Sequence, residues 1–158
     1  MSLTTEYLRM RGVAFETIPH DQAFTTIEEA RALGVRADQL VKTLLLDTER
    51  GHALAVIPGD RRLEMHLVAL AVGDPHVRMA SEPEMQRDLP GIELGAVPPL
   101  GGLLKFPVYV DPRVAEHETV VFAAGSQTES IKIGSRDLLD EEGVTVAPIT
   151  AEPSDVPT

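Results

Sequence analysis

The chain has 158 residues, 43% of them hydrophobic and 25% charged, and it carries a formal net charge of −11 at pH 7. This length and composition predict one globular domain with a real hydrophobic core. The negative charge argues against a protein that coats DNA or other nucleic acid non-specifically. The sequence contains no Cys, no apolar run long enough to span a membrane and no signal peptide at its start. We therefore expect a cytoplasmic protein without disulfides or thiolate chemistry.

Helix caps and apolar runs divide the first 90 residues into helices and strands. Either Thr4 or Thr5 can cap the first helix through its hydroxyl, and capping boxes of the form Ser/Thr-x-x-Glu begin at Thr25 and Ser81. Two apolar runs joined by the turn-like residues 48–51 predict a β-hairpin. The expected helices cover residues 4–11, 25–34, 63–72 and 81–89, and the expected strands cover residues 13–18, 41–47, 52–57 and 77–80.

The rest of the chain begins with a Gly- and Pro-rich stretch, residues 90–102, which predicts a long loop. Prolines from Pro148 onward indicate a flexible tail over residues 148–158, so residues 1–147 are expected to form the domain. With no internal repeat or linker, the pattern predicts a single α+β domain around a mixed sheet. The later expected elements are strands at 106–110, 119–123 and 130–133 and a short helix at 135–141.

Lys42 is the most informative residue, because it interrupts an apolar strand. Alternate residues of a strand face opposite sides, so Val41 and Leu45 are expected on one face while Lys42 shares the other with Leu44 and Leu46. An unpaired charge on an apolar face needs an anionic partner or an open cleft. The alternative is that the lysine stem lies along apolar surface while the ammonium reaches water.

The usual signatures of catalytic sites are missing. The five histidines lack the spacing of metal ligands, and the sequence has neither a phosphate-binding P-loop nor a dinucleotide-binding fingerprint. Ser126 follows a glycine, but Gly-x-Ser-x-Gly is absent, so a nucleophile elbow is unsupported. We therefore expect no metal ion and no cofactor.

Two segments remain beside Lys42, the loop from Gly95 to Gly101 and the turn at residues 123–128. Glycine allows close backbone approach and proline removes conformational freedom, so such a loop can hold backbone N–H groups toward a ligand. A loop that only connects two elements is the alternative, and on these physical grounds it is the commoner case.

Three segments in order resemble the YbaK-type family of aminoacyl-tRNA editing domains, which are related to the editing domain inserted in bacterial prolyl-tRNA synthetases. The resemblance covers about residues 2–146 and implies a mixed, strongly curved β-sheet with flanking helices. The matching segments are Leu-Val-Lys-Thr-Leu at 40–44, Gly95-x-x-x-Pro99-x-Gly101 followed by Pro-Val-Tyr-Val-Asp at 107–111, and Ala-Gly-Ser-x-Thr-Glu-x-Ile at 124–131, together with Phe-Thr-Thr-x-Glu-Glu-Ala at 24–30.

The resemblance also implies an activity, which is hydrolysis of the ester between a wrong amino acid and the 3′ end of a tRNA. Lys42 would hold the 3′-terminal nucleotide or the ester region, and the backbone N–H of Gly101 would stabilise the oxyanion. Water would attack with help from the substrate's own 2′-hydroxyl, and pocket size would reject correct amino acids. The other residues implied to bind substrate are Gly95, Pro99, Gly125, Ser126, Gln127, Thr128 and Ser130.

Two positions depart from common patterns of this family. Many relatives carry His where this chain has Gln127, and the branch that clears cysteine has Asp where this chain has Ser130. We therefore expect a free-standing deacylase for a small mischarged amino acid, with tRNA as its partner and an aminoacyl-tRNA synthetase as a candidate second partner. The alternative is a non-catalytic module that binds a nucleotide or an aminoacylated ligand, and a purely structural protein has the least support.

Overall fold

One mixed β-sheet runs through the computed structural model, which describes residues 2–93 and 95–151. Its strands are β1 (Phe15–Pro19), β2 (Leu40–Thr48), β3 (Gly51–Pro58), β4 (Arg78–Met79), β5 (Val108–Val110), β6 (Thr119–Ser126), β7 (Glu129–Gly134) and β8 (Val144–Val146). The strand order is β1-β7-β6-β2-β3-β5-β8, with β4 paired to β2. The β2–β3 hairpin is antiparallel, whereas β2 pairs with β6 and β3 with β5 in parallel.

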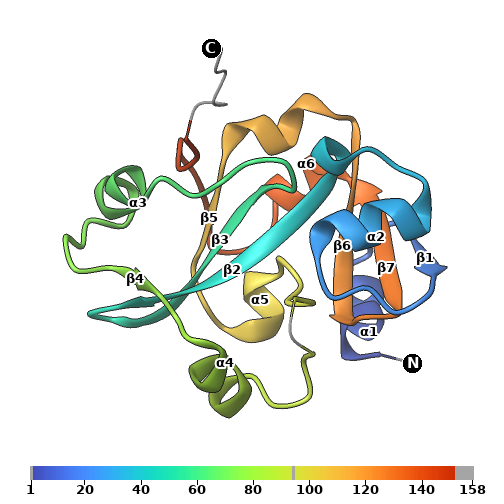
Figure 1. The fold of residues 1–158 in the computed structure, drawn as a ribbon, viewed down its shortest axis with the longest axis horizontal. Coiled ribbons are helices and arrows are strands. Elements are labelled where there is room, and N and C mark those ends of the chain that lie inside the picture. The colour runs from blue at the N-terminus through green and yellow to red at the C-terminus, as the bar shows by residue number, and fades with distance from the viewer. Residues whose placement is uncertain (1, 94, 152–158) are drawn as a thin grey trace.

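Short helices flank this sheet (Figure 1). They are α1 (Leu3–Met10), α2 (Thr26–Leu33), α3 (Met65–Val72), α4 (Glu82–Asp88), α5 (Gly101–Leu104) and α6 (Ser135–Leu139), with 3₁₀ turns η1 (Ala37–Gln39) and η2 (Pro112–Glu116). In Figure 1, α2 lies in front of β6 and β7. Helix α3 lies at the left, across the β2–β3 hairpin from α2. The predicted fold class is therefore confirmed. None of the described helices has the length and apolar content needed to cross a membrane.

The two predicted capping boxes are present at the starts of α2 and α4, with both reciprocal hydrogen bonds formed. The predicted cap of the first helix is wrong. Ser2 is the N-cap, and its hydroxyl accepts a hydrogen bond from the N–H of Thr5 at 3.1 Å. Thr4 lies inside the helix, where its hydroxyl donates to the carbonyl of Ala124 at 3.0 Å. That long-range bond fixes α1 against the end of β6.

The second half of the chain departs from the predicted boundaries. The predicted loop contains the short helix α5, which ends where Lys105 adopts a left-handed φ of 67°. Strand β5 consequently begins at Val108 rather than at residue 106. Strand β8 was not predicted, because its three residues are fewer than the runs of about four to eight that indicate a strand.

The packed chain continues past residue 147. Ile149 is fully buried, and the Asp111 carboxylate accepts hydrogen bonds from its N–H at 3.0 Å and from the Thr150 N–H at 3.1 Å. The Thr150 hydroxyl donates to the same carboxylate oxygen at 2.9 Å. Residues 149 and 150, which belong to the predicted tail over residues 148–158, are therefore held to the sheet. Residues 152–158 lie outside the described residues.

Candidate active site

The alternation predicted for β2 is present. Val41 and Leu45 are buried in the larger core cluster, whereas Leu46 is buried in a second cluster with residues of α3. Leu44 packs against that second cluster. Lys42 has the same parity as Leu44 and Leu46, so its side chain points to the face of the sheet that carries α3.

Neighbouring strands place another predicted residue on this face. Leu40 and Val121 form a paired row of β2 and β6, and both pack against α2. The described pairing of β2 with β6 ends one residue before Lys42, so the two strands separate there. The corresponding residue of β6, Ala123, pairs with Ser130 of β7. Lys42 and Ser130 therefore face the same side of the sheet, on strands with β6 between them.

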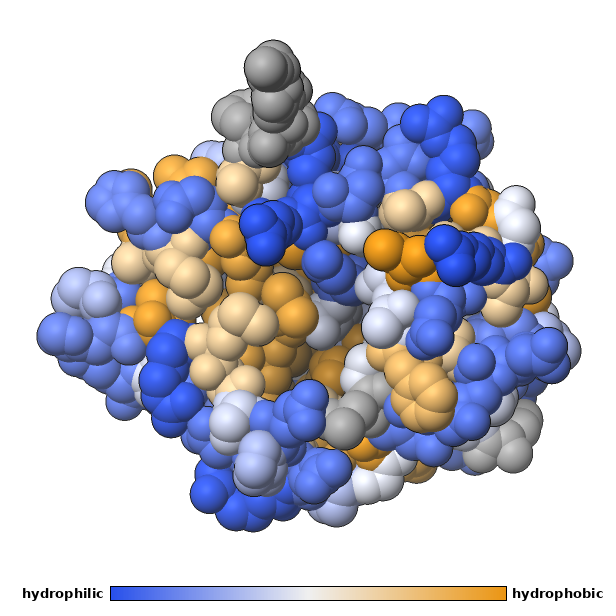
Figure 2. All heavy atoms as spheres, in the orientation of Figure 1, coloured by the Kyte–Doolittle hydropathy of each residue, from blue (hydrophilic) through white to orange (hydrophobic). Residues whose placement is uncertain are grey.

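This face of the sheet is packed by α2 at one end and by α3 at the other, and it is open between them. Figure 2 shows it hollowed between β2 and the region of α2, with apolar side chains gathered over β2 and β3. Lys42 is half-buried and forms no hydrogen bond or ion pair with any described residue. Burial lowers the pKa of its ammonium, Asp60 opposes this change, and Arg62 adds to it. A partly dehydrated cation without a partner is suited to bind a negatively charged or strongly polar ligand group.

The first residues of the predicted Gly-Pro loop contact the chain before α2 and the turn between β6 and β7. Gly95 is exposed and has a left-handed φ of 76°, and a Cβ at this position would lie 2.7 Å from the carbonyl oxygen of Phe24. The next residue, Ala96, accepts a hydrogen bond from the N–H of Gly125 at 2.8 Å. The structure therefore brings the beginning of the loop together with the third predicted segment and with the chain that enters α2.

The end of the loop lies elsewhere. Pro99 and Gly101 are buried, and a Cβ on Gly101 would lie 2.5 Å from the carbonyl oxygen of Phe106 and 2.6 Å from Val108 Cγ2. Val108 belongs to the larger core cluster, on the face opposite Lys42. Close packing therefore accounts for glycine at position 101. The oxyanion role of Gly101 stays a prediction.

The third segment forms the turn between β6 and β7. The Ser126 and Thr128 hydroxyls lie 2.9 Å apart and order this turn. Gln127 is buried, its N–H donates to the Glu93 carboxylate at 2.7 Å, and its side-chain oxygen accepts from the Gln22 amide at 2.9 Å. Gln127 thus connects the turn to the Gly-Pro loop and to the chain before α2.

Two residues that the sequence did not single out join Ser130. Its hydroxyl donates to the carboxylate of Glu29 on α2 and lies 2.8 Å from Nε2 of His20, which follows β1. Glu29 follows Glu28 in the first turn of its helix, where acidic residues are usually exposed. The available signal was its position beside Ala30, on the side of α2 that packs against the sheet.

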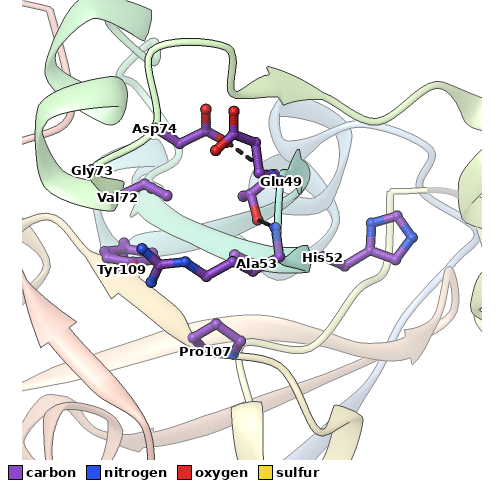
Figure 3. A pocket seen from close by; sticks show the side chains of 10 residues that line it. Glu49, His52, Ala53, Val72, Gly73, Asp74, Pro107 and Tyr109 are labelled. Atoms are coloured by element: carbon purple, nitrogen blue, oxygen red, sulfur yellow. Dashed lines mark hydrogen bonds between the residues drawn. The ribbon is translucent and has the colours of Figure 1, made fainter.

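A separate cavity of about 180 Å³ lies beyond the β2–β3 turn (Figure 3). Figure 3 shows Asp74 turned toward Glu49, whose N–H donates to the Asp74 carboxylate at 2.9 Å. His76 also donates its N–H to Asp74, at 2.8 Å. His52 and Tyr109 line the cavity too, but none of the residues predicted from the sequence does. The carboxylate therefore caps local turns here, away from Lys42.

The mixed sheet and the lysine on its open face define a domain of the tRNA-editing class. Residues 20–141 match the family model of the aminoacyl-tRNA editing domain, and this chain belongs to that family. The predicted family resemblance is thus confirmed.

Relatives in this family carry named activities. EbsC of Enterococcus faecalis, a candidate Cys-tRNA(Pro)/Cys-tRNA(Cys) deacylase, is 26% identical over 124 residues, which are 78% of this chain and 75% of EbsC. The multifunctional Ser/Thr-tRNA deacylase ProXp-y of Escherichia coli is 27% identical over 137 residues, or 84% of this chain and 81% of ProXp-y. The solved structure of a candidate trans-editing enzyme for prolyl tRNA synthetase has a TM-score of 0.81 at 28% identity and covers 95% of this chain and 96% of its own.

Proposed function

We propose that this protein is a free-standing aminoacyl-tRNA deacylase that removes a small, wrongly attached amino acid from tRNA. Family membership and the named activities of EbsC and ProXp-y support this proposal, and both relatives match over most of their length. Their names concern Cys, Ser and Thr, which are all small. In the reaction, water adds to the ester carbonyl, the bond to the 3′ oxygen breaks, and the amino acid leaves as a free acid.

The observation that carries the proposal is the unpaired Lys42 on the open face of the sheet. The 3′ end of a charged tRNA offers a phosphodiester and an ester carbonyl that becomes negative as water adds. Either group would satisfy the partly buried ammonium of Lys42. The backbone of Gly95 is exposed, and we assign its N–H the role of stabilising the carbonyl oxygen. Among the described residues near Lys42 we identify no activated nucleophile, which fits direct attack by water assisted by the substrate's 2′-hydroxyl.

The charge of the protein constrains how tRNA is held. With a net charge of −11, few cations are available for the phosphates. The candidate cations beside Lys42 are Arg62, whose charge acts on the Lys42 ammonium, and its neighbour Arg61. Binding of free tRNA should therefore be weak, and its affinity should fall only modestly with salt. A synthetase that holds the tRNA body would supply the missing contacts, which makes it the proposed second partner.

A panel of tRNAs charged with Ala, Ser, Thr, Cys and Pro tests the proposal. Wild-type protein should release at least one of the small amino acids, and Lys42→Ala should not. Lys132→Ala is the matched control. Lys132 is half-buried on the same face of the sheet, but it pairs with Glu16 on the neighbouring strand β1. If the wild type binds the charged 3′ end but hydrolyses no ester in the panel, the protein is a binding module instead.

A further inference from the structure

The turn that follows β3 carries an arginine without a partner. Arg61 is half-buried, and no described residue accepts a hydrogen bond from its shielded Nη1 or forms an ion pair with its guanidinium. A guanidinium has five N–H donors and stays charged at every pH that a protein meets in the cell. Because a shielded charge without a partner is costly, this arrangement indicates that an anion binds at Arg61.

The turn stands beside Lys42. Lys42 lies in the last part of the β2–β3 pairing, where β3 ends and the turn begins, and the chain then runs toward α3 (Figure 1). The charges on both neighbours of Arg61, which are Asp60 and Arg62, act on the ammonium of that lysine. Leu63 packs against the core cluster on the face of the sheet that carries Lys42. Arg61 therefore belongs to the same end of the open face.

Positive charge gathers here, although the whole protein has a net charge of −11. The carboxylate that acts on Lys42 is that of Asp60, which is exposed. The next acid in the chain, Glu64, caps α3 and accepts the N–H of His66 at 3.3 Å. The positive members of this cationic cluster are Lys42, Arg61 and Arg62. Such a concentration of one sign of charge raises the local concentration of anionic ligands.

We propose that Arg61 binds a phosphodiester of the tRNA 3′ end, the one that precedes the terminal adenosine. The planar fork of a guanidinium donates two parallel N–H bonds to a phosphate, whereas an ammonium is a compact point charge. Arg61 is therefore the group that suits the phosphodiester, and Lys42 is left for the ester carbonyl of the same nucleoside. This assignment rests on the proposed function, because it takes charged tRNA as the ligand.

The dinucleotide CpA tests the assignment without a measurement of activity, because it contains the phosphodiester and the terminal adenosine but no amino acid. In NMR titrations at low salt, the wild type should bind CpA, and Arg61→Gln should bind it about tenfold or more weakly. Arg50→Gln, which removes the same charge from an exposed position in the turn at the far end of the hairpin, should bind CpA like the wild type. Adenosine, which lacks the phosphate, should show no difference between wild type and Arg61→Gln.

Three results would overturn the proposal. The first is an equal CpA affinity for Arg61→Gln and the wild type, or a wild type that binds no CpA. The second is an equal loss of adenosine and CpA binding, which would show that Arg61 orders the site instead of binding phosphate. The third is inorganic phosphate that binds at Arg61 as tightly as CpA, which would assign the site to a free anion. Arg61→Lys keeps the charge without the fork, should weaken CpA binding several-fold, and serves if Arg61→Gln fails to fold.

Kinetics on the charged-tRNA panel give a second readout. Arg61→Gln should raise KM with little change in kcat, since the phosphodiester is the same in the bound substrate and in the transition state. If the wild type hydrolyses a charged tRNA while CpA binding ignores Arg61, this inference fails and the deacylase assignment stands. If CpA binding depends on Arg61 but no charged tRNA is hydrolysed, the phosphate site stands and the deacylase assignment fails.

Discussion

Replacing Lys42 by Met should separate stability from activity. The methionine keeps an unbranched apolar stem against Leu44 and removes a cation that is half-buried and has no partner among the described residues. Burial lowers the pKa of Lys42, so the folded protein binds its proton less tightly than the unfolded chain does. The wild type should therefore gain stability as the pH rises from the folded pKa to the unfolded one, because the unfolded chain then holds more protons. Lys42→Met should lack that gain.

At neutral pH we expect Lys42→Met to be as stable as the wild type or more stable by about 1 kcal/mol, since the cost of the dehydrated charge is removed. For a chain of this length, that corresponds to a melting temperature about 2–4 °C higher. Turnover should fall by about a hundredfold or more, the scale of losing one group that stabilises the transition state. Thermal melts and deacylation rates on the same preparation provide the measurement. A melting temperature several degrees below wild type would refute the reasoning, because Lys42 would then be part of the packing.

Three further results are expected. Gly101→Ala should cost about 1–3 kcal/mol of folding stability, because its Cβ would clash with the backbone of Phe106. The control Gly12→Ala, whose Cβ would meet no atom within 4 Å, should cost about 1 kcal/mol through its φ of 71° alone. Lost turnover of Gly101→Ala at unchanged stability would instead assign Gly101 the predicted oxyanion role. Asp111→Ala should cost about 2–4 kcal/mol in denaturant unfolding, since it leaves buried donors of Thr150 and its neighbour unpaired, and an unchanged midpoint would contradict this. Affinity for free tRNA should fall by less than about a hundredfold between about 50 and 200 mM salt, and a steeper slope would show more phosphate contacts than the charge allows.

The sequence predicted most of the elements that carry local signals. Both capping boxes, the β2–β3 hairpin and the faces of β2 follow from short-range patterns, and the structure contains them. The cap of α1 could not be chosen from the sequence alone, because the Thr4 hydroxyl donates a hydrogen bond to the carbonyl of Ala124, 120 residues away. The burial of Ile149 and Thr150 was missed for the same reason, since their N–H groups donate to Asp111, 38 and 39 residues away.

The candidate site was predicted in part. Lys42 stood out because a charge in an apolar strand is unusual, and Ser130 was found through the family resemblance. His20 and Glu29 were missed because each looks like an ordinary polar residue at the end of a strand or in a first helical turn. Gly101 was placed in the site by its motif, and its close packing against Phe106 and Val108 is a second reason for glycine at this position. Only the three-dimensional arrangement shows that the start of the Gly-Pro loop lies beside Phe24 and Gly125.

The most direct test of the central claim is single-turnover hydrolysis of the best substrate in the charged-tRNA panel. Wild type and Lys132→Ala should release the amino acid at similar rates, while Lys42→Ala should remain folded and be slower by about a hundredfold or more. Equal rates for Lys42→Ala and the wild type would contradict the account.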